Sequence, residues 1–210
     1  MKIVCVGLNY RDHAREVTLD VPDHPLLFAK WPSALIGTGE AIVIPHGVAD
    51  VDYEAELAAI VGSRVKGVSV EHALEAVEGY TCLNDVSARA VQFSDGQWTR
   101  GKSFDTFCPM GPRVVPREEI GDPQSLRISC RLNGETVQAA STADMIFSVA
   151  EIVSFASRGT TLEPGDVIAT GTPRGVAMGQ PEPRYLRPGD RVEVEIEGIG
   201  VLANPVVAAP

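Results

Sequence analysis

Glycine and proline interrupt this chain so often that it has little room for long helices. Its 210 residues include 20 glycines and 15 prolines, which favour turns and end regular structure. The segments between them are short and rich in apolar and β-branched residues, a composition typical of strands. We expect strands at residues 3–6, 41–44, 51–61, 79–84, 126–132, 136–139, 167–170, 191–197 and 201–206.

Two segments carry clear helix signals. The first covers residues 70–77 and follows Ser69, which is a favourable N-cap residue. The second covers residues 145–157, with Asp144 as its expected cap and Gly159 at its end. Two helices among nine strands predict a mainly β protein with a few short helices, in the α+β class.

The chain shows no sign of division into separate domains. It contains no internal repeat, no low-complexity tract and no linker-like change in composition. Hydrophobic residues make up 44% of it, which is enough for a substantial core. Asn133 and Gly134 between two expected strands predict a tight hairpin. We therefore expect one domain over residues 1–210.

The charge and cysteine content narrow the classes of partner. A formal net charge of −10 argues against nucleic acid and against an anionic membrane surface as partners. The four cysteines are scattered without a CxxC pair, and a chain of this size does not need disulfides. The N-terminal apolar run is too short for a signal peptide, and no stretch is long enough to span a bilayer. We expect a cytoplasmic protein with reduced thiols.

Acidic residues occupy every second position at Asp50, Asp52, Glu54 and Glu56. In a strand they would share one face, roughly 7 Å apart, and carboxylates that close together need either open solvent or a cation. The segment with Glu193, Glu195 and Glu197 shows the same alternation. A half-solvated strand produces this pattern without any function, so periodicity alone favours that interpretation for both segments.

Asp85 follows the apolar run 80–83 and offers a third carboxylate to a cation held by Glu54 and Glu56. Three oxygens from two strands would leave coordination positions open for water and substrate, as Mg²⁺ prefers. An Asp at a strand end is also an ordinary turn or cap residue. Both interpretations stay open on spacing alone.

Residues 8–25 are polar and contain few core side chains. We expect this segment to cross the surface as a loop or short helix, and mobile lids over active sites have this composition. Within it, His13 and Glu16 would share one face of a helical turn. A carboxylate paired with an imidazole orients the ring and makes it a general base, although a solvated helix face would also accommodate both.

Two further segments could serve a site. Lys102 lies among aromatic and glycine residues, where it could stabilise an anion or pack its stem on a ring at the surface. Residues 170–173 form an expected turn whose amides and hydroxyls could hold a carboxylate, or could serve the turn alone. Motifs for nucleotide binding and for serine hydrolases are absent from the sequence.

The order of these motifs is more specific than any one of them, and it resembles the fumarylacetoacetate hydrolase family along nearly the whole chain. The length is similar to that of the single-domain acylpyruvate hydrolase and oxaloacetate decarboxylase-like branch. The resemblance rests on GLNYxxHAxE (7–16), FAKxPSA (28–34), DYExEL (52–57), NDxSAR (84–89), GQWTRGKSFDTF (96–107), TGTPxGV (170–176) and EGIGxLxNPV (197–206).

The resemblance implies a mixed β-sandwich or β-roll, usually in a homodimer. It also implies that Glu54, Glu56 and Asp85 bind Mg²⁺ or Mn²⁺. Asp50 and Asp52 are then left with turn, supporting or surface roles. The C-terminal row of glutamates lies outside every family motif, which separates it from the row at 50–56.

The resemblance also implies catalytic and substrate-binding positions. His13 and Glu16 match the base dyad of the family's lid, and Lys102 matches its active-site lysine. Leu8 stands where many relatives carry Arg, so one contact to a substrate carboxylate is in doubt. The expected substrate-binding residues are Arg89, Gln92, Thr172 and Lys30.

The implied substrate is a small anionic oxoacid. The reaction we expect is Mg²⁺- or Mn²⁺-dependent C–C hydrolysis of a 2,4-dioxo acid of the acylpyruvate or fumarylpyruvate type, through a metal-bound enolate. Decarboxylation of oxaloacetate and isomerisation of 2-hydroxyhepta-2,4-diene-1,7-dioate would use the same site. A non-catalytic protein that binds a metal and an oxoacid is the alternative from another class, and an intact base dyad argues against it. Aromatic-acid catabolism is the setting that the resemblance suggests.

Overall fold

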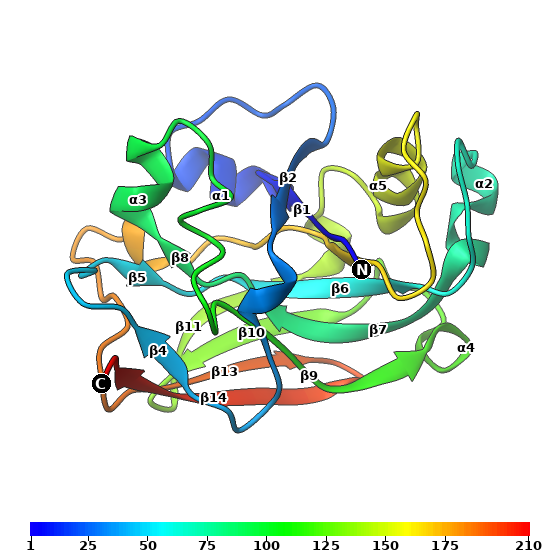
Figure 1. Cartoon of the computed structure of the whole chain (residues 1–210). Helices are drawn as coiled ribbons and strands as arrows, with labels where there is room; N and C mark the ends of the chain where they lie inside the picture. Colours follow the sequence, from blue (N-terminus) through cyan, green and yellow to red (C-terminus); the bar gives the residue numbers. More distant parts are fainter.

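Two stacked sheets form most of the protein in the computed structural model, which describes residues 1–210 (Figure 1). The larger sheet has seven strands in the order β2-β1-β12-β6-β7-β9-β3. Neighbours are antiparallel except for the pairs β1–β12 and β3–β9. Its strands are β1 (Ile3–Gly7), β2 (Leu26–Lys30), β3 (Leu35–Ile36), β6 (Ala55–Val61), β7 (Val77–Asn84), β9 (Cys108–Pro116) and β12 (Val167–Ala169).

The smaller sheet has five strands in the order β11-β10-β13-β14-β4, and only β4 runs parallel to its neighbour. A separate two-stranded ribbon joins β5 (Val51–Asp52) to β8 (Ser87–Ala88). The strands of the smaller sheet are β4 (Ile42–Ile44), β10 (Arg127–Leu132), β11 (Glu135–Ser141), β13 (Arg191–Ile196) and β14 (Gly200–Ala208).

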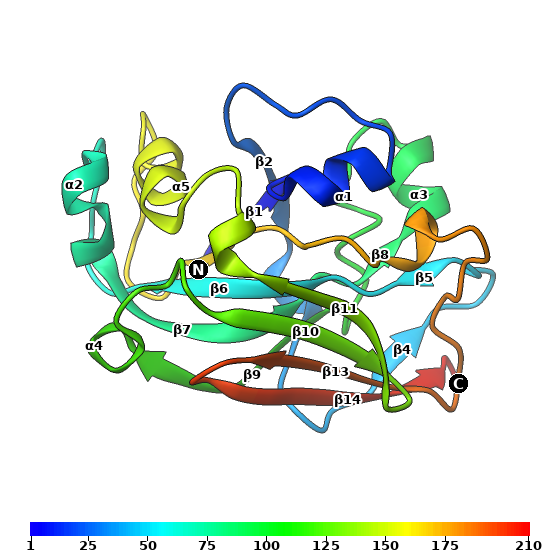
Figure 2. The ribbon, with the colours of Figure 1, turned by 180° about the vertical axis from the view of Figure 1, so that it is seen from behind.

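The helices are short and lie on one side of the larger sheet, opposite the smaller sheet, except for α4 (Figures 1 and 2). Because both faces of the larger sheet are covered, all seven residues of β6 are buried. A cluster of 35 buried apolar residues fills the core. The α-helices are α1 (Arg11–Glu16), α2 (Val70–Ala73), α3 (Arg89–Ser94), α4 (Arg117–Ile120) and α5 (Val149–Ala156); the 3₁₀ turns are η1 (Pro32–Ala34), η2 (Leu74–Ala76), η3 (Thr142–Asp144) and η4 (Ala177–Gly179).

The expected fold class is confirmed, and each of the nine expected strand segments contains a strand. The expected hairpin is also confirmed: Asn133 and Gly134 have φ values of 52° and 84° and connect β10 to β11. Both residues adopt the left-handed conformation that a two-residue hairpin turn requires, and Asn and Gly tolerate it at low cost.

Both expected helices are shorter than predicted. The first ends its α-helical part at Ala73 and continues as η2. The second begins only after Ser148, which forms a capping box with Glu151. Asp144 instead belongs to η3, where its side chain accepts a hydrogen bond from the Ser141 amide. The prediction that Asp144 caps the second helix was therefore wrong.

The expected strand 51–61 is interrupted at Tyr53 and Glu54. The first part, β5, pairs with β8, while the second part, β6, pairs with β7 and β12. The acidic row therefore does not lie on one continuous face. The interruption places Asp52 on a different pair of strands from Glu56.

Candidate active site

Three carboxylates meet beside the ends of β6 and β7. Glu54 immediately precedes β6, Glu56 lies within it, and Asp85 follows β7. One carboxylate oxygen from each residue lies within 4.8 Å of the others. All three residues are buried, with exposed fractions of 5%, 1% and 0%. The structure thus brings together the three residues that the sequence predicts as metal ligands.

Lys102 connects two of these carboxylates. Its Nζ donates to Glu54 Oε2 at 2.9 Å, to Asp85 Oδ2 at 2.8 Å and to Ser87 Oγ at 2.8 Å. Burial alone would lower the pKa of Lys102, but Asp85 and Glu54 outweigh it and raise the pKa above its ordinary value. Lys102 is therefore a charged group in a water-poor environment.

Arg89 supplies a second buried cation. One of its terminal nitrogens lies 2.8 Å from Asp52 Oδ2 and 2.7 Å from Glu54 Oε1. Burial would raise the pKa of Glu54, but the adjacent Lys102 and Arg89 lower it to about 2. Glu54 is consequently ionised at neutral pH.

For Glu56, the effects that raise the pKa outweigh those that lower it. Burial, followed by repulsion from Asp85 and Glu54, raises the pKa of Glu56 well above its ordinary value. Its Oε2 accepts a hydrogen bond from the Gly171 amide at 2.9 Å. Gly171 has a φ of +96°, and a Cβ there would lie 2.7 Å from Asn9 Cβ, so glycine is required for this close approach.

These residues fit a divalent cation. Carboxylate oxygens on fixed backbone segments are the donors that Mg²⁺ and Mn²⁺ prefer. The buried cluster holds four carboxylates, including Asp52, and three cations, including Lys30. The excess negative charge and the raised pKa of Glu56 both show that the carboxylates are under-neutralised. A divalent ion bound by Glu54, Glu56 and Asp85 would relieve their repulsion.

The predicted base dyad lies close to the carboxylate triad, beside a pocket. His13 on α1 is buried and lines the pocket with Glu54 and Glu56. Its Nδ1 lies 3.3 Å from Glu16 Oε2. When Glu16 accepts the Nδ1 proton, Nε2 is left as the basic nitrogen of the ring. The two residues therefore have the arrangement of an oriented general base.

Both ends of α1 are fixed by hydrogen bonds. Before the helix, the Asn9 side chain donates to the carbonyls of Phe147 and Thr170 and accepts from the Phe147 amide. At its end, Glu16 accepts from the amide of Gly175 and from Gln180 Nε2. These contacts place His13 over the carboxylates. The predicted mobility of residues 8–25 stays a prediction.

Gln92 and Thr172 line the pocket as expected, and each keeps a free donor. Gln92 Oε1 accepts from Arg89, while its Nε2 has no protein partner. Thr172 Oγ1 accepts from Gln138, so its hydroxyl proton remains available. Both side chains can donate hydrogen bonds to an anionic or carbonyl oxygen.

Lys30 does not line the pocket, which corrects its expected contact with substrate. Its side chain is fully buried, and Nζ donates to Asp85 Oδ1 at 2.6 Å and to the Val86 carbonyl at 3.1 Å. The short distance between Lys30 Nζ and Asp85 Oδ1 makes Lys30 a buried ion-pair partner of Asp85. The adjacent buried charge explains why this lysine can be buried at all.

Asp52 has a larger structural role than its sequence position suggests. It is fully buried and accepts hydrogen bonds from the amides of Ala177 and Met178 and from Arg89. It thereby holds η4 and Arg89 in place beside the pocket. Its membership in the acidic row was the available signal, but the contact with Ala177 spans 125 positions and no local pattern reveals it.

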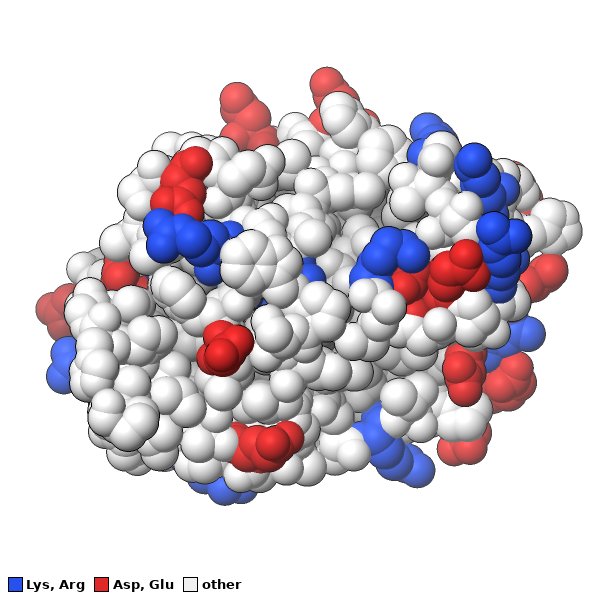
Figure 3. Space-filling model, in the orientation of Figure 1, with Lys and Arg blue, Asp and Glu red and all other residues white.

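The surface charges and the helices bear on the classes of partner considered from the sequence. On the face shown in Figure 3, acidic and basic side chains are interspersed without a continuous basic patch. None of the helices is long and apolar enough to cross a membrane. All four cysteines are free and buried.

The fold and site define a β-sandwich protein with a buried carboxylate triad, two members of which line a pocket with a histidine and a lysine. The chain belongs to the fumarylacetoacetate hydrolase family: the family described as fumarylacetoacetate (FAA) hydrolase, C-terminal, matches residues 2–207. This result confirms the resemblance that the motifs predict.

Relatives cover nearly all of this chain. An uncharacterised protein of Methanocaldococcus jannaschii is 51% identical, over 98% of this chain and 82% of its own length. The mitochondrial oxaloacetate tautomerase Fahd2a of Rattus norvegicus is 44% identical, over 98% of this chain and 66% of its own length. The chain thus spans slightly less than two thirds of the length of that mammalian relative.

Solved structures share the fold at comparable identity. The fumarylacetoacetate hydrolase of Exiguobacterium antarcticum has a TM-score of 0.92 and 45% identity, covering 99% of this chain and 75% of that one. The 5-carboxymethyl-2-hydroxymuconate delta-isomerase of Mycobacterium smegmatis has a TM-score of 0.89 and 40% identity, covering 100% and 79%. The named relatives include hydrolases, tautomerases and isomerases, so family membership alone leaves the reaction open.

Proposed function

We propose that the protein is a Mg²⁺- or Mn²⁺-dependent enzyme that cleaves a C–C bond of a small 2,4-dioxo acid by hydrolysis. The observation that carries this proposal is that His13, paired with Glu16, lines one pocket with Glu54 and Glu56, whose carboxylates cluster with that of Asp85. A protein that only binds an oxoacid needs no oriented base. A divalent ion on the triad would polarise the 2-oxo group and stabilise the enolate charge released on cleavage.

The protein's own groups account for the remaining steps. Glu16 orients the His13 ring, and His13 removes a proton from a water molecule that attacks the 4-oxo carbon. The charge of Lys102, whose hydrogen bonds go to Glu54, Asp85 and Ser87, stabilises through its electric field the negative charge that develops on the 4-oxo oxygen. The C3–C4 bond then breaks and its electron pair passes to the pyruvate fragment. The proton that His13 took from water is returned to C3, which completes pyruvate, and the other product is a carboxylic acid.

Gln92 and Thr172 suit the binding of the substrate's polar end. Their free donors face the same pocket as the triad. Arg89 already contacts Asp52 and Glu54, so we assign it the role of holding Glu54 rather than that of a mobile substrate clamp. Lys30 holds Asp85 in the same way.

A proton transfer without cleavage is the second candidate reaction. It is favoured by the 44% identity to a protein named oxaloacetate tautomerase and by the similarity to a solved isomerase. Such a reaction would need the His13–Glu16 dyad but no attacking water. Decarboxylation of oxaloacetate would need neither, because the bond to carbon dioxide breaks directly.

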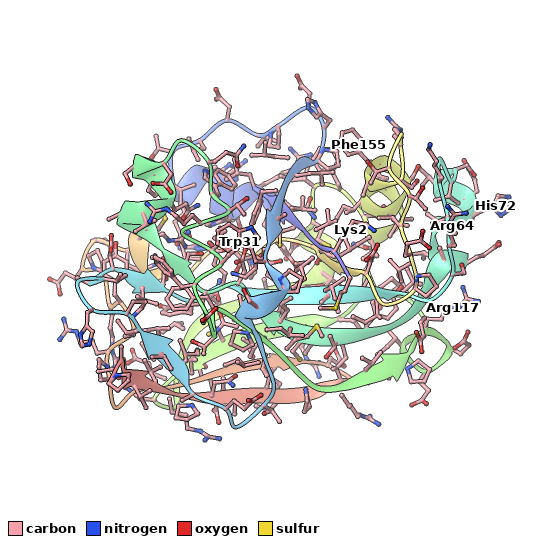
Figure 4. The ribbon with its side chains drawn as sticks, viewed as in Figure 1. Lys2, Trp31, Arg64, His72, Arg117 and Phe155 are labelled. Carbon is pink, nitrogen blue, oxygen red and sulfur yellow. The ribbon has the colours of Figure 1, made fainter.

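The test measures consumption of 2,4-dioxopentanoate by chelator-treated protein before and after addition of Mg²⁺ or Mn²⁺. We expect activity only with the metal. His13→Ala should lower kcat by about 10²- to 10⁴-fold, the usual contribution of a general base. The exposed pair His72 and Glu75 has the same three-residue spacing outside the pocket (Figure 4), so His72→Ala is the matched control. Turnover that is independent of metal or of His13 would refute the mechanism.

A further inference from the structure

The pocket lining has a polar part and an apolar part. The polar end consists of Glu54, Glu56, His13 and Lys102, together with Arg89, Gln92 and Thr172. Away from them, the pocket meets aliphatic and aromatic side chains from several segments. These apolar residues are Val6, Leu8, Val17, Leu19, Phe28, Phe93, Trp98 and Met178.

Phe28 marks the transition between the two ends. Lys102 Nζ lies 5.0 Å from the centre of the Phe28 ring, and the other neighbour of this ring is Trp98, at 5.3 Å between centroids in an edge-on arrangement. Trp98 also packs on Gly7, where a Cβ would lie 2.5 Å from its ring. An aromatic wall therefore extends from the lysine toward the pocket mouth.

Two side chains at the mouth remain exposed to solvent. Leu19 is 47% exposed and Phe93 is 52% exposed, and both line the pocket. Large apolar side chains at the rim of a binding pocket are stabilised when an apolar group covers them. Their position, continuous with the polar end, makes the far part of the bound substrate the group that covers them.

The pocket offers no free positive charge to a second carboxylate. Lys102 is bonded to Glu54 and Asp85, and the Arg89 guanidinium contacts Asp52 and Glu54. No other lysine or arginine lines this pocket. A carboxylate placed against the aromatic wall would lose water without gaining an ionic partner, which is unfavourable.

We infer that the apolar wall of Leu19, Phe28, Phe93 and Trp98 selects oxoacids with an uncharged, apolar tail over dicarboxylic oxoacids. This inference rests on the proposed function and names its substrate class: an acylpyruvate whose acyl group is alkyl or aryl. The wall disfavours the binding of oxaloacetate and long dienedioates, because both would place their distal carboxylate against it.

Two 2-oxo acids of equal chain length isolate the effect of the tail. The first is 2-oxohexanoate, which ends in a methyl group, and the second is 2-oxohexanedioate, which ends in a carboxylate. Neither has a 4-oxo group, so neither can be cleaved, and calorimetry on the Mg²⁺-loaded protein reports binding alone. We expect the first acid to bind at least about tenfold more tightly, since the second must desolvate a charge.

Arginine substitutions test which residues cause the selection. Leu19→Arg and Phe93→Arg should each shift the preference toward 2-oxohexanedioate by supplying the missing cation. Val21 lies two residues after Leu19, is 39% exposed and does not line the pocket. Val21→Arg should therefore leave the ratio of the two dissociation constants unchanged.

The outcomes separate the inference from the proposed function. Equal or tighter binding of 2-oxohexanedioate by the unmodified protein would overturn the inference and leave C–C hydrolysis standing. An unchanged ratio in both arginine variants at the pocket would overturn the assignment of the selection to this wall. If neither acid binds in the presence of Mg²⁺, the proposed function itself fails.

Discussion

Lys30 Nζ lies 2.6 Å from Asp85 Oδ1, and both side chains are completely buried. The pair holds the Asp85 carboxylate through one of its oxygens, while the other oxygen contacts Lys102. Such an ion pair is costly to break because the surviving charge remains buried. The orientation of Asp85 is therefore set before any ion or substrate enters.

Replacing this lysine should destabilise the metal-free protein. We expect Lys30→Met to lower the free energy of unfolding by about 3–5 kcal/mol, measured by urea denaturation, since Asp85 loses a buried partner. Addition of Mg²⁺ should raise the melting temperature of the variant more than that of the parent, because the ion restores positive charge. Arg64 pairs with Glu163 at the surface (Figure 4), so Arg64→Met should cost less than about 1 kcal/mol. Equal costs for the two substitutions would contradict the assignment.

Metal affinity should depend on the triad and not on the other acidic row. We expect Glu54→Gln and Asp85→Asn each to weaken Mn²⁺ binding by at least about tenfold, since each removes an anionic oxygen ligand. Glu195→Gln is the control, because Glu195 lies on β13 in the same alternating pattern but is exposed and contacts Arg131. Calorimetric titration measures all three variants. Retained affinity in the first two would remove these residues from the metal site.

Removal of the base should affect hydrolysis and decarboxylation at this site to different extents. His13→Ala is expected to slow hydrolysis of 2,4-dioxopentanoate by about 10²- to 10⁴-fold, since no group then deprotonates water. Any decarboxylation of oxaloacetate by the protein should survive, because that reaction requires no attacking water. Parallel assays of pyruvate release from both compounds measure the difference. An equal loss of both activities would argue against separate water-dependent and water-free routes.

Asp166 should make the stability depend on pH. Burial would raise its pKa, but hydrogen bonds from the amides of Glu163 and Lys2 and the charge of Lys2 lower it below its ordinary value. A folded-state pKa below the unfolded-state pKa stabilises the protein above the unfolded value, and this stability is lost as the pH falls.

We therefore expect Asp166→Asn to cost about 1–3 kcal/mol at pH 7. The difference in melting temperature between variant and parent should shrink as the pH falls below about 4. Asp20 is exposed and accepts no hydrogen bond, so Asp20→Asn should have little effect at any pH. A difference for Asp166→Asn that stays constant down to pH 3 would contradict the linkage.

The expected homodimer should involve the outer edge of β2. This strand is at one end of the larger sheet, and Leu26, Leu27 and Trp31 on and beside it are 40%, 37% and 50% exposed. Apolar sheet edges favour association. Light scattering should give twice the monomer mass for the parent and a lower average mass for Leu27→Lys. Val114→Lys, at a 44% exposed position on β9, should leave the mass unchanged.

The sequence predicts the two acidic rows equally well as strands, but it does not reveal how each is buried. Glu195 has a side chain that is 48% exposed, while Glu56 is 1% exposed. The difference arises because helices and loops cover the outer face of β6. Alternation describes one strand, whereas burial depends on what packs against it. Only the order of motifs along the chain distinguished the two rows.

Other features escaped prediction for identifiable reasons. Strand β9 contains Pro109, Pro112 and Pro116, and proline usually argues against a strand interior. The roles of Asn9 and Asp52 depend on partners more than a hundred positions away. The position of Lys30 depends on Asp85, which is 55 positions away. Local sequence patterns cannot report such contacts, so they identified candidate site residues without assigning all their roles.

Trp98 gives the pocket an intrinsic spectroscopic reporter. The chain has two tryptophans: Trp98 forms part of the pocket wall, and Trp31 is half exposed outside it. A ligand tail that lies on the Trp98 indole replaces water there and should shift its emission to shorter wavelength, while Trp31 contributes a constant background. In a Trp31→Phe variant the entire indole signal would come from the pocket. Occupancy could then be followed in unlabelled protein, during single turnovers as well as at equilibrium.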